Sequence, residues 1–238
     1  MKKMAICIFI FIWPLTARAN GVDAIAYFEL GLKSNMTGRK INYFSKALEL
    51  NPLLTEAYEK RGMLYYFQGK YELMIKDFKR FMELDTPKAK DLRMLGIGYL
   101  KTGFYAKAIS CFASAIELDP DSADAYSSRS EAYRLVGKYD QAIRDSTTAI
   151  RIGADPLILC EAYRNRYKIY WKLGQTDKAY ADLKNAWNID PRVWQILKRE
   201  GGDFNYLGYM KKMGLIYLIG IAAGLIFKLK LKPPEKDE

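Results

Sequence analysis

A period of 34 residues runs through the middle of this 238-residue chain. Dipeptides that follow short apolar stretches mark it, with steps of 34, 34, 34 and 37 residues: Asn51-Pro52, Asp85-Thr86, Asp119-Pro120, Gly153-Ala154 and Asp190-Pro191. A fixed period of this length is typical of stacked repeats, each too small to bury its own apolar face. We therefore expect an array of similar units and not a single globular core.

Each unit is expected to contain two amphipathic helices. Apolar residues recur at steps of three and four through two stretches of about a dozen residues. Between the stretches a glycine recurs, where it would end the first helix in the left-handed conformation. These glycines are Gly69, Gly103, Gly137 and Gly174.

Small and aromatic residues repeat at the same period. The second unit has Gly62, Tyr65, Gly69, Tyr71 and Phe78, and the third has Gly96, Tyr99, Gly103, Tyr105 and Phe112. This pattern resembles the tetratricopeptide repeat (TPR) family over about residues 21–193. The resemblance implies an all-α fold, a right-handed α-solenoid of about five helix hairpins with a concave side.

The array is expected at residues 20–200. Its units are placed at about residues 21–54, 55–88, 89–122, 123–156 and 160–193, with a capping helix at 192–200. In the first unit Gly31 and Gly38 fall three places off register from Phe44 and Ala47, which indicates a short deletion in its first helix. The step of 37 indicates an insertion of about three residues near residues 155–159.

The net charge of +11, from 38 basic and 27 acidic residues, is spread along the chain. Residues 1–19 and 211–238 each carry +3, which leaves +5 on residues 20–210 with the signs interspersed. Such a surface is typical of solvated helices, so we expect no nucleic-acid partner. The sequence has no histidine and no phosphate loop, nucleophile elbow or metal-ligand cluster. We therefore expect no enzyme activity, no cofactor, no metal and no small-molecule substrate.

The first 19 residues have the pattern of an export signal peptide. A basic start precedes an uncharged apolar run from Met4 to Trp13, and Ala17-Arg18-Ala19 fits a cleavage site. The alternative, an uncleaved anchor, is weaker because the run is much shorter than the roughly 20 residues that span a bilayer. Cleavage would leave Cys111 and Cys160, which we expect as small buried apolar residues.

The composition changes after residue 200. A linker at 201–212 leads to an apolar segment at 213–231, which we expect to be a transmembrane helix, and to a tail at 232–238. The uncharged part of this segment is short, but the lysines on both sides can snorkel to the membrane surface. The alternative, a buried core helix, would need a pocket that a solenoid lacks. Gly220 and Gly224 match the small-xxx-small motif, so a homodimer through this helix stays open.

The first helix of each pair is expected to line a concave groove, where a solenoid carries its function. Both charge signs and several apolar side chains fall on this face, which suits a peptide better than a phosphate chain. The carboxylate clamp of chaperone-adaptor TPR proteins is not expected, because other residue types stand at its Lys and Asn positions. The expected partner-binding residues are Glu59, Met63, Tyr66, Arg93, Ile97, Ser127, Glu131, Arg134, Arg164, Lys168 and Trp171.

These observations predict a non-catalytic scaffold for protein–protein interaction that binds a peptide or partner protein in its groove. The two ends of the sequence predict a single-pass protein of a bacterial cell membrane, with the repeats on the extracytoplasmic (periplasmic) side. The alternative is a structural or assembly subunit of a bacterial envelope machine for secretion, adhesion or surface assembly. Such a subunit would contact its neighbours through the convex face and the membrane helix.

Overall fold

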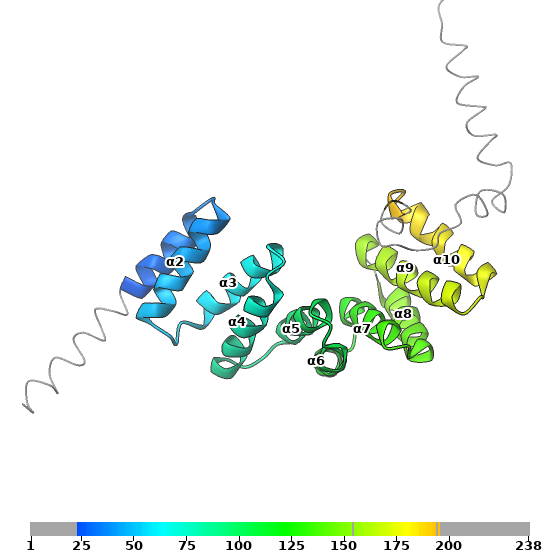
Figure 1. Ribbon diagram of the computed structural model, residues 1–238, viewed down its shortest axis with the longest axis horizontal. Helices are drawn as coiled ribbons and strands as arrows, with labels where there is room; N and C mark the ends of the chain where they lie inside the picture. Colours follow the sequence, from blue (N-terminus) through cyan, green and yellow to red (C-terminus); the bar gives the residue numbers. More distant parts are fainter. Residues whose placement is uncertain (1–22, 154, 194, 196–238) are drawn as a thin grey trace, which may run out of the picture.

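The described residues form a chain of helices joined by short turns (Figure 1). The computed structural model describes residues 23–153, 155–193 and 195, and within them it contains no strand. Residues 23–33 are helical, and the later helices are α2 (Thr37–Leu50), α3 (Thr55–Phe67), α4 (Tyr71–Leu84), α5 (Ala89–Lys101), α6 (Tyr105–Leu118), α7 (Ala123–Leu135), α8 (Tyr139–Ile152), α9 (Pro156–Lys172) and α10 (Thr176–Ile189). The expected helical repeat fold is confirmed in this part of the chain.

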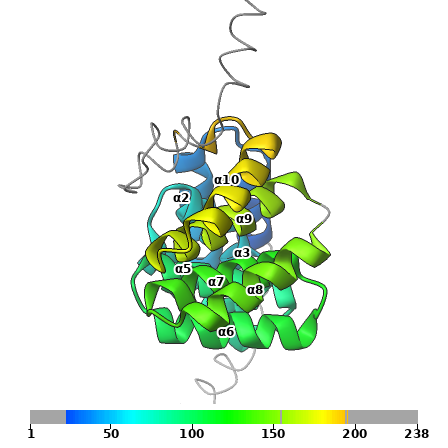
Figure 2. The ribbon, with the colours of Figure 1, turned by 90° about the vertical axis from the view of Figure 1, so that its right-hand side faces the viewer.

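Successive helices pair into five hairpins, which we number units 1 to 5. Unit 1 is residues 23–33 with α2, and units 2 to 5 are α3/α4, α5/α6, α7/α8 and α9/α10. The second helix of each hairpin also packs on the first helix of the next unit. In Figures 1 and 2 the middle of the array, α6, lies at the bottom and both ends, α2 and α10, lie above it, so the array curves.

The first helices lie on the inner side of this curve. α7 contacts α9 directly and α5 contacts α7, whereas the structure gives no comparable contact between neighbouring second helices of the described units. The inner side of a curved stack is shorter than the outer side, so its helices come closer together. The face formed by α3, α5, α7 and α9 is called the groove below.

The turn inside units 2 to 5 is built on a left-handed glycine, as expected. Gly69, Gly103, Gly137 and Gly174 have φ of +70°, +82°, +78° and +70°. An added Cβ would meet no atom within 4 Å at any of them, so the backbone conformation, and not space, requires glycine. In each case the amide that follows the glycine donates to the carbonyl of a tyrosine in the preceding helix, as Lys70 does to Tyr65 at 2.9 Å.

The expected deletion in unit 1 is wrong. Its first helix ends at residue 33 and α2 begins at Thr37, which are 34 residues before the corresponding ends at Phe67 and Tyr71. Asn35 stands at the position of the turn glycine, so Gly31 and Gly38 were the wrong landmarks. Gly31 serves close contact instead, because a Cβ there would lie 2.5 Å from the Phe44 ring.

The insertion between units 4 and 5 is present as additional helix. α9 has 17 residues, whereas α3, α5 and α7 have 13 each. The helices end at equivalent positions, so the additional turn lies at the start of α9. Asp155 caps this turn by accepting a hydrogen bond from the Leu157 amide at 2.7 Å, and Pro156 occupies the first turn.

A buried ion pair joins the two helices in units 2, 4 and 5. The arginine donates from Nε and Nη2 to both oxygens of the aspartate at distances of 2.7 to 2.9 Å. Each guanidinium also lies 5.5 to 5.9 Å from the rings of two tyrosines on its own helix. The pairs are Arg61 with Asp77, Arg129 with Asp145, and Arg166 with Asp182.

Several expectations concern residues outside the described part. These are the signal peptide at 1–19, the linker at 201–212, the membrane helix at 213–231 with Gly220 and Gly224, the tail at 232–238 and most of the capping helix at 192–200. Among the residues that the structure describes, no helix combines the length and the apolar character needed to cross a bilayer. Both described cysteines are free thiols, with Cys160 buried and Cys111 half-buried.

Candidate functional site

Residues expected to bind a partner lie in rows across the groove. One row contains Glu59, Arg93, Ser127 and Arg164, each at the same position of its helix. The next row, one turn further along each helix, contains Met63, Ile97, Glu131 and Lys168, and the third begins with Tyr66 and continues with Arg134 and Trp171. All of these side chains are half-buried except Ser127.

Ser127 differs from the expectation because it is only 2 % exposed. α7 and α9 lie in direct contact at this point, and Asn165 Nδ2 on α9 donates to the Ser127 carbonyl oxygen at 3.3 Å. A serine is small enough to lie under this contact, whereas arginine occupies the same position in units 3 and 5. Ser127 therefore belongs to the floor between the two helices and not to the open wall.

Ion pairs connect successive units along the first part of the groove. Lys90 Nζ lies 2.9 Å from Glu59 Oε1, and Arg93 Nη1 lies 3.7 Å from Asp124 Oδ2. Both pairs join a residue of the Glu59 row to the residue near the start of the next first helix. These charges neutralise one another between units 2 and 3 and between units 3 and 4.

The same connection is missing between units 4 and 5. Ser127 and Glu161 occupy the two positions, and Glu161 pairs instead with Arg164 of its own helix at a distance of 3.7 Å. Burial among the neighbouring helices raises the pKa of Glu161, Arg164 and Lys101 lower it, and the carboxylates of Glu131 and Asp124 raise it further. The Glu161 carboxylate is thus poorly neutralised in the free array, although 42 % of its side chain is exposed.

Buried polar atoms without a hydrogen-bond partner gather at this same place. Among the residues described, they are Ser127 Oγ, Arg134 Nε and Arg164 Nε. All three belong to α7 and α9, and each had been expected as a binding residue from the sequence. A buried polar group without a partner lowers stability by about 1–3 kcal/mol, so native proteins rarely keep one without a reason.

The apolar wall residues lie mainly toward the other end of the groove. Met63 and Tyr66 on α3 pack at the margin of the core cluster formed by Met74, Phe78 and Phe81. Trp171 on α9 contacts the rings of Tyr167 and Tyr180, with centroid distances of 6.1 and 5.9 Å. The indole is therefore part of the unit 5 core as well as of the wall, and it is not a free aromatic shelf.

Lys101 is a member of the site that the sequence reasoning missed. It ends α5 and lowers the pKa of Glu161 across the groove. The signal was available, because Lys101 follows Ile97 by four residues and so shares its helix face. The described groove holds no group of three His, Cys, Asp or Glu side chains that could bind a metal. Its chemistry is that of hydrogen bonding and charge pairing.

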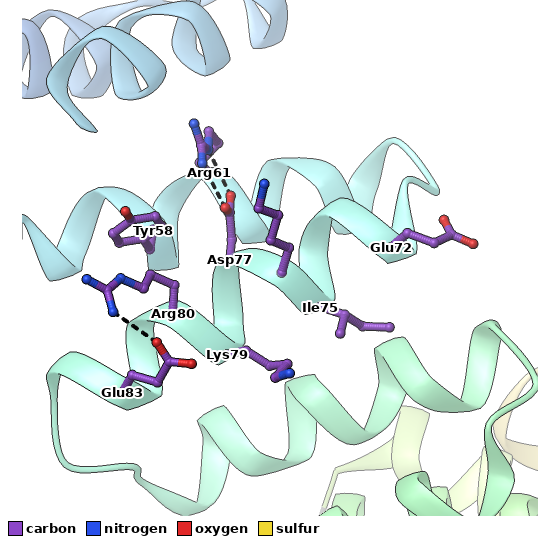
Figure 3. Close-up of a pocket in the computed structure, with 9 residues that line it drawn as sticks. Tyr58, Arg61, Glu72, Ile75, Asp77, Lys79, Arg80 and Glu83 are labelled. Carbon is purple, nitrogen blue, oxygen red and sulfur yellow. Dashed lines mark hydrogen bonds and ion pairs between the residues drawn. The ribbon is translucent and has the colours of Figure 1, made fainter. Parts of the chain in front are cut away.

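A second depression lies on the outer side, around α4 (Figure 3). It has a volume of about 590 Å³ and is wide open. Its charged groups are largely paired within the chain, as Arg61 is with Asp77 and Arg80 is with Glu83 at 2.9 Å. The groove, where buried polar groups stay unpaired, is therefore the better candidate for a binding site.

Comparisons with known proteins agree with the helical repeat. Residues 55–87 and residues 93–156 each match a family model described as a tetratricopeptide repeat. The chain therefore contains TPR units, as the resemblance implied. No curated protein gives a significant match to the sequence.

Solved TPR structures share the fold. A crystal structure of the MamA protein has 26 % sequence identity and a TM-score of 0.63, covering 74 % of this chain and 96 % of that one. The structure of MamA residues 41 to the end from Desulfovibrio magneticus RS-1 has 15 % identity and a TM-score of 0.64, covering 71 % and 96 %. YrrB, described as a TPR protein with an unusual peptide-binding site, has 22 % identity and a TM-score of 0.61, covering 75 % and 92 %.

Proposed function

We propose that this protein is a non-catalytic interaction scaffold that binds a segment of a partner protein in its groove. The observation that carries the proposal is the set of unpaired polar groups on α7 and α9, at the one junction where the ion pairs between units stop. A TPR array is a stack of similar hairpins, so a local departure from its pattern points to a local role. YrrB shows that this fold can carry a peptide-binding site; the place of the site here follows from this chain's own residues.

The bound segment is an extended or helical peptide. Arg134 and Arg164 are donors that a peptide carbonyl or carboxylate can satisfy, and Glu131 and Glu161 can accept from peptide amides or cationic side chains. Met63 and Ile97 offer an apolar surface further along the groove. A ligand that pairs the polar groups and covers this apolar surface gains both hydrogen bonds and apolar burial.

Membrane attachment is the second part of the proposal, and it rests on sequence alone. The apolar segment at 213–231 would hold the array beside a membrane, with the signal peptide directing the repeats to the extracytoplasmic side. Extraction of membranes at alkaline pH tests this part by itself. Release of the full-length protein into the supernatant would contradict the anchor and leave the groove proposal unchanged.

The groove is tested by capture of a partner with the full-length, tagged protein. We expect Arg134→Gln with Arg164→Gln to remove a cross-linked partner that the unaltered protein captures in native membranes. The matched control is Arg144→Gln with Arg151→Gln, which removes two exposed arginines from α8. Circular dichroism checks that both variants keep their helices. A folded groove variant that still captures the partner would favour contacts through the convex face.

A further inference from the structure

The two edges of the array carry opposite charges. The turns inside the hairpins lie at one end of the helices, and the connections between hairpins lie at the other end, because successive helices are antiparallel. We call these the turn edge and the connection edge. Each follows the curve of the whole array, and they face away from each other.

The turn edge is basic in every unit. From the last residue of the first helix to the first residue of the second, each of the five segments contains one lysine and no acidic residue. Acidic residues such as Glu72 and Asp140 occur only further inside the second helices. None of the five lysines forms an ion pair with a described residue, and all five are exposed: Lys33, Lys70, Lys101, Lys138 and Lys172.

The connection edge is acidic. Asp85, Asp119, Asp121 and Asp155 are exposed in the connections that precede units 3, 4 and 5. The basic residues in these three connections amount to Lys88 alone. The fifth aspartate of this edge, Asp190, is already paired with Arg192 at 3.0 Å.

Both edges also expose apolar side chains. On the turn edge Met36, Phe67 and Phe104 are 57 %, 73 % and 56 % exposed, and on the connection edge Leu53 and Leu157 are 66 % and 73 % exposed. A single exposed apolar side chain is ordinary, but apolar tips beside a repeating row of one charge sign are typical of an interaction surface.

We propose that the turn edge of one copy of this protein docks on the connection edge of a second copy. The charges are complementary, and both edges have apolar tips that would be buried in the contact. The two rows of charges share one repeat spacing, because both follow the same stack of units. A second copy also has the same curvature, whereas a flat bilayer could touch only part of a curved edge. The assignment does not depend on the groove.

The two docking surfaces differ, so the contact is heterologous. One copy that docks by its turn edge leaves its connection edge free for a third copy, and the assembly grows until geometry closes it. Because the attraction comes from exposed charges, association is expected to weaken as salt is added. A dimer held by apolar packing at Gly220 and Gly224 would lack this salt dependence.

The test is a pair of charge reversals in the full-length protein, held in one detergent and followed by sedimentation. The turn variant is Lys70→Glu with Lys138→Glu, and the connection variant is Asp85→Lys with Asp121→Lys. Each variant alone would present two edges of the same sign, so we expect its self-association to weaken by about tenfold or more. The control, Lys76→Glu with Lys184→Glu, makes the same charge change on the exposed sides of α4 and α10 and should associate as the unaltered protein does.

Mixing the two variants decides which occupant is correct. The acidic turn edge of one variant matches the basic connection edge of the other, so association should return in the mixture and should again fall with salt. No recovery on mixing, or association that ignores salt, would overturn the proposal. Binding of the unaltered protein to phosphatidylglycerol vesicles, with no self-association at low salt, would assign the turn edge to a membrane surface instead.

Discussion

Units 2, 4 and 5 and unit 3 close the same joint in different ways. In unit 4 Arg129 and Asp145 form a buried two-bond ion pair between the helices. In unit 3 the equivalent positions hold Leu95 and Cys111, which pack with Phe78 and Phe81 of the preceding unit and neighbouring apolar residues. The repeat therefore accepts either a paired charge or an apolar pair at this position, but not half of each.

The polar version also reaches the preceding unit. Arg61 Nη1 donates to Ser45 Oγ on α2 at 2.9 Å, and Arg166 Nη1 donates to Thr147 Oγ1 on α8 at 2.9 Å. One guanidinium thus joins three helices in units 2 and 5. Leu95 has no donor, so the junction between units 2 and 3 depends on apolar contact there. The difference shows that neighbouring repeats of one array can be joined by different physical means.

The largest expected effect comes from breaking one polar joint. Asp145→Ala would leave the Arg129 guanidinium without its partner inside the protein, and we expect the free energy of unfolding to fall by about 3–5 kcal/mol. Urea denaturation followed by circular dichroism measures it. Asp140→Ala, at an exposed position on the same helix, should lower the free energy by less than about 1 kcal/mol. Equal effects of the two changes would contradict a special role for the pair.

Moving the polar joint into unit 3 sharpens the comparison. Leu95→Arg alone buries a charge without a partner and should be strongly destabilising. Adding Cys111→Asp should recover about 2 kcal/mol, measured as the coupling in a double-mutant cycle of unfolding free energies. If the double variant is no more stable than the sum of the single effects predicts, the two positions are not an interchangeable pair.

The close helix contact in unit 3 gives the next effect. A Cβ on Gly96 would lie 2.6 Å from a carbon of the Phe112 ring, so Gly96→Ala should destabilise by about 1–3 kcal/mol. Phe112→Leu in the same protein should relieve part of this loss. Gly38→Ala is the control, because a Cβ there meets nothing within 4 Å and alanine favours helix. Thermal melting of the four proteins ranks them, and a Gly96→Ala variant as stable as the control would refute the contact.

The smallest effect concerns the groove. The folded pKa of Glu161 is raised, so the folded protein holds this proton more strongly than the unfolded chain does, and wild-type stability falls as pH rises between the two values. Glu161→Gln removes this loss. We expect the variant to melt slightly higher than wild type at neutral pH and equally at acid pH. Glu117→Gln, exposed on α6, reports the same substitution outside the groove, and an equal gain there would contradict the assignment.

Local constraints made part of the fold predictable from the sequence. The turn glycines repeat because the backbone needs a left-handed residue, and Gly69 and Gly103 announce this need directly. The arginine and aspartate of units 2, 4 and 5 also recur at fixed repeat positions, which is a readable signal that the aromatic pattern obscured. In unit 1 Asn35 took the glycine position, and the register was misread for that reason.

The groove was harder to predict because it depends on how first helices approach one another. Sequence position placed Ser127 on the wall, but the contact of α7 with α9 buries it. The loss of the cross-unit ion pair at Glu161 follows from the same local approach, which no single helix encodes. Lys101 could have been found from its helix face, whereas its electrostatic effect on Glu161 required the curvature of the array.

The longer α9 has a practical consequence. The chain has accepted additional residues between units 4 and 5 by starting a helix earlier, while Arg164, Lys168 and Trp171 keep the spacing that Ser127, Glu131 and Arg134 have on α7. The junction around residues 153–157 is therefore a natural place to graft a reporter peptide or a fluorophore. A label placed there would leave the binding rows in phase, and one engineered into any other junction would test whether this tolerance is unique to it.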